Sequence, residues 1–149
     1  MKTILTTSLL LLTLSNSYAG ILPSLGNNYT PNFAPKEWIT KHPACAGMTH
    51  QMQPFVMNNL QQLRDYMNEP LTIMSAWRCA EHPVEQIKLK PGQHYEGRAV
   101  DIYVTSGAMA YKIIKYALTN LGATGFAYSK EGGFVHIDWR KGVGVTWNY

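Results

Sequence analysis

The chain has 149 residues, a normal size for one domain around one hydrophobic core. Its 13 Lys and Arg residues against 9 Asp and Glu residues give a formal net charge of +4. The basic residues are scattered, with only Lys88 and Lys90 close together, and they do not form the aromatic-interleaved basic stripe of nucleic-acid-binding proteins. We therefore expect no nucleic acid among the partners of this protein.

Residues 1–19 have the pattern of a secretory signal peptide. Lys2 precedes an apolar stretch from Ile4 to Leu14, and small residues stand before a cleavage site ahead of Gly20. The apolar stretch is too short to span a bilayer, and no other stretch of the sequence is long or apolar enough to cross a membrane. We expect export to the periplasm or the medium, with no stable membrane insertion after cleavage.

Cys45 and Cys79 are the only two cysteines. An exported protein enters an oxidising compartment, and the C-x-x-C spacing typical of metal-binding cysteines is absent. The two residues are therefore predicted to form a disulfide, which stabilises the fold by about 3 to 4 kcal/mol in the chain-entropy model.

The first half of the mature chain is predicted to contain one helix and one strand. Residues 20–36 are rich in Pro, Asn, Gly and Ser and are interpreted as an irregular leader to a domain at 37–149. Apolar residues at steps of three and four predict an amphipathic helix over 51–67. A strand is expected at 71–77, and the Pro-containing segment 81–93 is expected to be a surface loop.

The second half is predicted to contain a helix between strands. Residues 98–104 alternate between apolar side chains and others, which predicts a half-buried strand. Ser106 can cap a second amphipathic helix that Gly122 ends. Two more strands are expected at 124–128 and 134–140. The sum is a single α+β domain with a small, mostly antiparallel sheet flanked by helices.

One candidate metal-binding segment reads H-x-x-G-x-A-x-D at residues 94–101. Gly97 allows a tight turn after His94, because glycine has no side chain that could collide with the backbone. Asp101 follows on a predicted strand. A turn followed by a short strand can bring the imidazole of His94 and the carboxylate of Asp101 to one ion.

A second segment, Phe134-Val135-His136-Ile137-Asp138, carries an H-x-D pattern on a predicted strand. Two histidines and one carboxylate form a ligand set that suits Zn²⁺ and leaves a coordination position open for water. Zinc can make that water a nucleophile near neutral pH. Spacing alone leaves open that both histidines are ordinary surface or core residues.

These motifs resemble the zinc D-Ala-D-Ala carboxypeptidase and murein endopeptidase family, which shares its fold with vancomycin-resistance dipeptidases, phage endolysin peptidases and the hedgehog signalling domain. Residues 75–78 resemble the S-G-Y-R segment of the family, with Ala76 and Trp77 as departures. Residues 125–128 resemble its G-V-G-Y segment. The resemblance covers about 71–147 and includes the order and spacing of all four segments.

The resemblance implies roles for four residues. It implies that His94, Asp101 and His136 bind zinc. Arg78 would bind the substrate, as a fixed cation for a substrate carboxylate or for the carbonyl oxygen at the cut bond. Tyr128 is expected to line the cleft and contact the substrate.

The general base is less well defined, because Gly133 stands where several relatives have an acidic residue. Asp138 and Glu131 are the remaining candidates for this catalytic role. Asp138 could instead orient a ligand imidazole, and Glu131 could be a solvated turn residue. The sequence leaves these alternatives open.

The resemblance implies a zinc metallopeptidase that hydrolyses peptide bonds in the stem peptides of bacterial peptidoglycan, as a D,D-carboxypeptidase or as a cross-link endopeptidase. We expect it to act as a monomer. The alternative is a non-catalytic, zinc-containing module for cell-wall binding or interaction, which the absence of the acidic residue at position 133 keeps open. A purely structural secreted domain is a third reading.

Overall fold

The computed structural model describes residues 30–149. The predicted signal peptide and residues 20–29 of the predicted leader lie outside the described residues. Phe33, in the last part of that leader, is buried and packs on Trp38, with 5.2 Å between the ring centroids. Within residues 30–149 there is no helix with the length and apolarity needed to cross a membrane.

A five-stranded sheet forms the centre of the domain, in the order β1-β2-β4-β3-β5. Neighbouring strands are antiparallel except β3 and β5, which are parallel. The strands are β1 (Ile73–Ser75), β2 (Ala99–Tyr103), β3 (Gly125–Ser129), β4 (Phe134–Asp138) and β5 (Val145–Asn148). The predicted α+β class with a mostly antiparallel sheet is confirmed, whereas β5 was not predicted.

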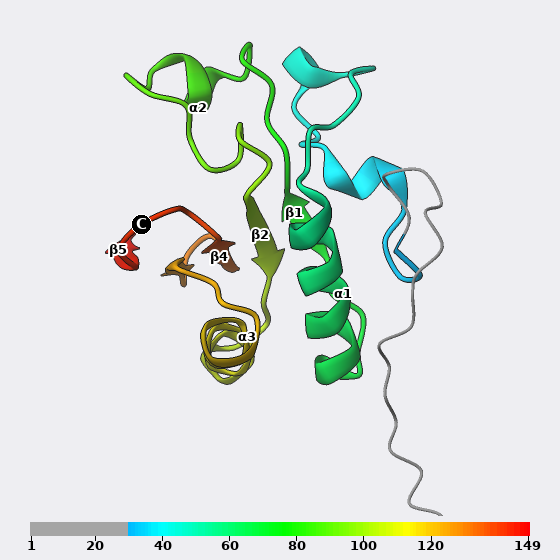
Figure 1. Cartoon of the computed structure of the whole chain (residues 1–149), viewed down its shortest axis with the longest axis vertical. Helices are drawn as coiled ribbons and strands as arrows, with labels where there is room; N and C mark the ends of the chain where they lie inside the picture. Colours follow the sequence, from blue (N-terminus) through cyan, green and yellow to red (C-terminus); the bar gives the residue numbers. More distant parts are fainter. Residues whose placement is uncertain (1–29) are drawn as a thin grey trace, which may run out of the picture.

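The two long helices begin at the residues that local chemistry favours. Helix α1 (Pro54–Met67) starts with a proline, whose missing N–H is not needed in a first turn. Helix α3 (Gly107–Asn120) starts after Ser106, whose hydroxyl accepts a hydrogen bond from the Met109 N–H. In Figure 1, α1 stands nearly upright and α3 is seen nearly end-on, so the helices cross at a large angle.

Three short helices complete the described chain: η1 (Pro35–Trp38), η2 (Pro43–Cys45) and α2 (Pro83–Gln86). Helix α2 corrects the prediction that 81–93 is only a loop. It begins at a proline and is capped by His82, whose Nδ1 accepts the Val84 N–H. One turn is too short to produce a helical period in the sequence.

One face of the sheet forms the hydrophobic core with α1 and α3. The core-facing strand residues are fully buried, as are the main apolar residues of the two helices. These residues are Val100, Ile102, Val135 and Ile137 on the strands, Val56, Leu60 and Leu63 on α1, and Ile113 and Ala117 on α3.

The opposite face of the sheet is also covered, which corrects the prediction of a half-buried strand at 98–104. Asp101 is buried, and of the β2 residues only Tyr103 is exposed. The segment before β2 brings His94 against Asp101 on this face. Alternation reveals a polar position on a strand but does not reveal that another segment covers it.

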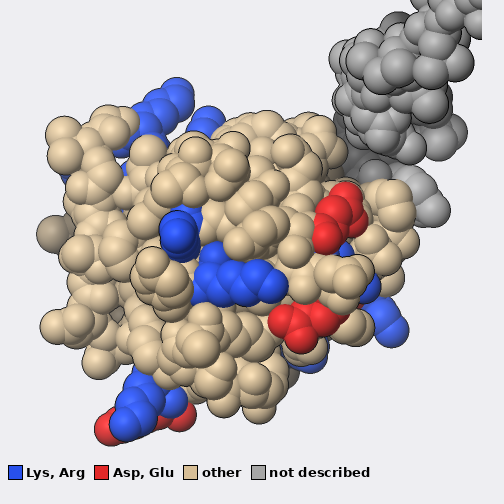
Figure 2. Space-filling model, turned by 90° about the horizontal axis from the view of Figure 1, so that it is seen from below, with Lys and Arg blue, Asp and Glu red and all other residues tan. Residues whose placement is uncertain are grey.

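The predicted disulfide is present. Cys45, at the end of η2, is bonded to Cys79, and their Cα atoms lie 5.6 Å apart. The bond fixes the segment that follows β1, next to Arg78. The face in Figure 2 carries basic and acidic side chains among many uncharged ones, without a continuous basic surface.

Candidate metal centre

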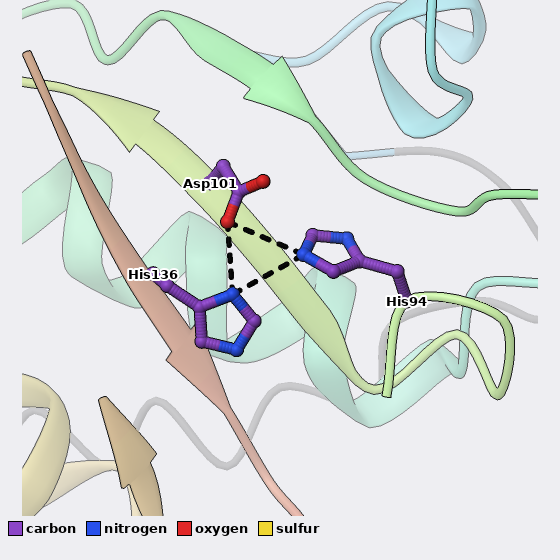
Figure 3. A group of neighbouring side chains, drawn as sticks. All are labelled: His94, Asp101 and His136. Atoms are coloured by element: carbon purple, nitrogen blue, oxygen red, sulfur yellow. Dashed lines mark hydrogen bonds and ion pairs between the residues drawn. The ribbon is translucent and has the colours of Figure 1, made fainter. Parts of the chain in front are cut away.

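Three buried side chains meet on the covered face of the sheet (Figure 3). His94 Nε2 lies 3.2 Å from both Asp101 Oδ1 and His136 Nδ1, and the last two atoms lie 2.9 Å apart. We call these three residues the His–Asp–His cluster. The structure therefore brings together the three residues that the sequence motifs selected.

The strands place two members of the cluster. Asp101 on β2 and His136 on β4 are direct partners in the antiparallel ladder, so their side chains leave the sheet on the same face. No special loop is needed to bring them together.

A tight turn places the third member, His94. Gly97 has a φ of +67°, in the left-handed region that favours glycine. A Cβ atom at this position would lie 2.0 Å from the backbone oxygen of Gln51. The Gln53 N–H also donates to the Gly97 carbonyl, at 3.0 Å. The turn is therefore held against the segment that leads into α1, and only glycine fits there.

Partners on the outer side of each imidazole determine which ring nitrogen carries the proton. His94 Nδ1 lies 2.6 Å from the Ala76 carbonyl oxygen, and His136 Nε2 lies 3.0 Å from Asp138 Oδ2. Both oxygens are acceptors, so both of these nitrogens donate. The neutral rings then present lone pairs at His94 Nε2 and His136 Nδ1.

The centre of the cluster therefore holds three acceptor atoms and favours a cation. Burial lowers the pKa of His94, which keeps this ring neutral. Burial opposes a second proton on His136, but the hydrogen bonds with Asp101 and Asp138 outweigh it and raise the pKa of that ring. Without a metal ion, a proton on Nδ1 of His136 thus takes the place of the cation between the acceptors. Burial alone would raise the pKa of Asp101, but His94 and His136 hold it well below its ordinary value.

The residues fit a zinc ion by chemistry and by spacing. Two imidazoles and one carboxylate are typical of catalytic zinc sites. In a tetrahedral site with bonds of about 2.0 to 2.1 Å, ligand atoms lie roughly 3.3 Å apart. The separations of 2.9 to 3.2 Å within the cluster are close to this value.

Asp138 lies behind His136, on the side away from the centre of the cluster. It is fully buried and accepts hydrogen bonds from His136 Nε2 and from the backbone and side chain of Arg140. Gly125, its partner on β3, leaves room for the carboxylate, because a Cβ atom there would lie 2.3 Å from Asp138 Oδ1. The geometry thus orients Asp138 toward the outer nitrogen of His136.

Arg78 lies on the Asp101 side of the cluster. Its Nη2 donates to Asp101 Oδ2 at 2.7 Å, and its Nε donates to Ser75 Oγ at 3.1 Å. The side chain is 16% exposed, so its guanidinium is fixed and still accessible. The substrate-binding role that the sequence resemblance implies for Arg78 stays a prediction.

The cluster opens into a cavity of about 430 Å³. Among the described residues that line it there is no Asp or Glu. The Trp147 ring packs edge-on against His136, with 4.9 Å between the ring centroids. The residues that line the cavity include Arg78, Lys88, His94, His136, Arg140 and Trp147.

Two predicted site residues lie elsewhere. Tyr128 pairs with Val135 across β3 and β4, so its side chain leaves the sheet on the face opposite His136. Tyr128 therefore does not face the His–Asp–His cluster, and the proposed function gives it no contact with the substrate. Glu131 lies exposed in the turn between β3 and β4 and makes none of the hydrogen bonds of the cluster.

Sequence reasoning missed Arg140 and Trp147 as residues of the cavity. Arg140 could have been found, because alternation from His136 through Asp138 places it on the same side of the chain. Trp147 belongs to β5, a short strand that follows a Gly-containing segment and pairs with β3. Nothing in the local pattern indicates that pairing.

A protein-family model described as Peptidase M15 matches residues 31–138. The match covers more than half of the chain and includes the whole His–Asp–His cluster. No curated protein matches the sequence.

Proposed function

The chain belongs to the peptidase M15 family, and from this membership and its His–Asp–His cluster we propose that it is a zinc-dependent peptidase of bacterial peptidoglycan. One observation carries the metal part of the proposal: three acceptor atoms, with their outer partners in place, meet within 3.2 Å in a buried site. The sequence resemblance to D-Ala-D-Ala carboxypeptidases and murein endopeptidases supports the substrate.

In this proposal His94, Asp101 and His136 hold the metal. When bound, zinc supplies a Lewis acid that polarises a carbonyl group and lowers the pKa of water to near neutrality. The Ala76 carbonyl and Asp138 keep the two imidazoles in the tautomers that offer lone pairs to the ion.

Arg78 supports the carbonyl oxygen of the cut bond. Its contacts with Asp101 and Ser75 hold the guanidinium beside the cluster, where negative charge develops on that oxygen during hydrolysis. A donor fixed before the reaction does not have to reorient during it, which is why such groups accelerate acyl transfer.

We assign Asp138 as a positioning residue rather than as the general base. It contacts the ring nitrogen of His136 that faces away from the centre, and it is also engaged by Arg140. Glu131 belongs to an exposed turn, and no described Asp or Glu lines the cavity. This last observation also favours the second candidate function, a zinc-containing module that binds the wall without cutting it.

Incubation of the purified protein with isolated peptidoglycan, with the products identified by mass spectrometry, tests the proposal. We expect new muropeptides with zinc-loaded protein, none with metal-stripped protein, and recovery on adding zinc. The products also show whether a terminal residue or a cross-link is removed. Binding to peptidoglycan without any product from folded, zinc-loaded protein would support the binding module instead.

The setting of this activity is also a proposal. The signal-like pattern at residues 1–19 and the Cys45–Cys79 disulfide support export to the periplasm or the medium. There the protein would act as a monomer on the stem peptides of the wall.

A further inference from the structure

Three cations border the cavity beside the His–Asp–His cluster, and each is paired with a buried carboxylate. The pairs are Arg78 with Asp101, Lys88 with Glu85, and Arg140 with Asp138. The carboxylate side chains are 0 to 7% exposed, whereas the cationic side chains are 16 to 34% exposed. A ligand in the cavity therefore meets N–H donors, with the acidic partners behind them.

The guanidinium of Arg140 is held by Asp138 and Trp147, and none of its hydrogen bonds is to the His–Asp–His cluster. Its Nε donates to Asp138 at 2.8 Å, and its Nη2 also contacts that carboxylate. Its Cζ lies over the Trp147 ring, 5.0 Å from the centroid. Within residues 30–149 its Nη1 makes no hydrogen bond, so this end of the fork is free for a ligand.

The two arginines reach the cluster from different sides of His136. Arg78 acts through Asp101, which contacts Nδ1 of His136, and Arg140 acts through Asp138, which contacts Nε2. Arg78 is thus next to the centre, whereas the Asp138 carboxylate and the His136 ring lie between Arg140 and the centre along these contacts.

We propose that Arg140, resting on Trp147, binds a free carboxylate of the substrate on the residue next to the cut bond. The inference rests on the proposed function and names the substrate feature that the site selects. A guanidinium matches a carboxylate in charge and in planar geometry, and stacking on an aromatic ring does not cover the Nη1 end that Asp138 leaves free.

Two substrates share this chemistry. Release of a terminal D-Ala leaves a carboxylate on the departing residue, and so does cutting a cross-link to the D-centre of diaminopimelate. The common feature is a carboxylate on the carbon that bears the leaving amine. Arg140 would therefore serve either reaction, and the choice between them is an outcome of the test.

The test compares two substrate pairs with zinc-loaded protein. One pair is a blocked peptide that ends in D-Ala-D-Ala, with a free carboxylate or a carboxamide. The other is a cross-linked muropeptide dimer with the corresponding diaminopimelate carboxylate free or amidated. We expect wild-type protein to prefer the free carboxylate in at least one pair, and the pair that is cleaved identifies the source of the carboxylate.

In the Arg140→Gln variant we expect KM for the free-carboxylate substrate to rise on the order of 10- to 100-fold, since a charge-assisted hydrogen bond is lost. Any loss that acts through Asp138 should lower kcat/KM for the carboxylate and the amide by the same factor. We therefore expect a larger loss for the carboxylate, so that the preference disappears. Lys141→Gln removes the same charge from the next residue, which is exposed, and should keep the preference. Arg140→Lys keeps the positive charge but not the planar guanidinium, and it should keep part of the preference for the free carboxylate.

The outcomes separate this inference from the proposed function. Arg140→Gln could lower kcat/KM by the same factor for the carboxylate and the amide, and also lower the zinc content. That result would mean that Arg140 acts only through Asp138, and it would overturn the inference. Cleavage of both members of each pair at equal rates by wild-type protein would also overturn it, with the peptidase function intact. Cleavage of none of the four substrates would contradict both.

Discussion

The outer contacts of the two histidines determine what the cluster can bind. His94 donates to a backbone carbonyl and His136 donates to Asp138, so each ring turns a lone pair toward Asp101. A cluster of three acceptors is unfavourable unless a cation lies between them. Residues outside the cluster therefore determine its chemistry. His94 has a backbone carbonyl as its partner, so Asp138 is the outer partner whose side chain a substitution can change.

Asp138→Asn tests whether this carboxylate positions His136 or accepts a proton. We expect zinc affinity to fall by about 10- to 100-fold, because an amide orients the imidazole less well. We also expect peptidoglycan hydrolysis to recover when zinc is added in excess. The measurements are zinc affinity and hydrolysis rate over a range of zinc concentrations.

If the variant binds zinc as tightly as wild-type protein but loses turnover by about 10² to 10⁴ at every zinc concentration, Asp138 is the general base after all. Glu131→Gln is the matched comparison, since it removes a carboxylate from an exposed turn. We expect that variant to bind zinc with unchanged affinity.

At the scale of elements, the sequence predicted most of what carries the cluster. The H-x-x-G-x-A-x-D and H-x-D patterns located the turn and the two strands, because glycine requirements and strand alternation are local properties. The half-buried prediction for β2 failed because burial of its second face depends on the distant segment that carries His94. Helix α2 was missed because one turn is too short to show a helical period, and β5 was missed because nothing in the local sequence indicates its pairing with β3.

One departure from the family pattern has a local explanation. Trp77 stands where the resembled S-G-Y-R segment has tyrosine. Its indole Nε1 donates to the Tyr95 carbonyl at 2.9 Å, in the segment that carries His94. The larger side chain therefore helps to hold the turn that brings His94 to the cluster.

Gly97→Ala tests the role of this turn. A Cβ atom would collide with the Gln51 backbone, and the left-handed conformation adds strain on the order of 1 to 3 kcal/mol. We expect a lower free energy of unfolding and weaker zinc binding, because the turn must shift and carries His94 with it. Denaturant unfolding and zinc affinity measure the two effects.

Gly122→Ala is the matched control for this turn. Gly122 has a φ of +66°, but a Cβ atom there would meet nothing within 4 Å. This variant should lose only about 1 kcal/mol of stability and keep its zinc. Equal zinc affinity in the two variants would show that the Gly97 turn does not position His94.

At the scale of the whole molecule, one sheet separates two environments. The face toward α1 and α3 holds the apolar core, and the other face holds the cluster with its buried partners. The Cys45–Cys79 bond fixes the segment between β1 and α2, from which Arg78 reaches Asp101. The sequence predicted this disulfide. It could not predict how Arg140 and Trp147 meet at the cavity, because that contact depends on the pairing of β3 with β5.

The central claim is that His94, Asp101 and His136 hold one zinc ion, and zinc content tests it most directly. Native mass spectrometry of purified wild-type protein and of the variants His94→Ala, Asp101→Ala and His136→Ala gives the number of ions bound per chain. We predict one zinc per chain in wild-type protein and in His42→Ala, which removes an imidazole outside the cluster, and no tightly bound zinc in the three cluster variants. Full zinc content in any two of the cluster variants would contradict the account.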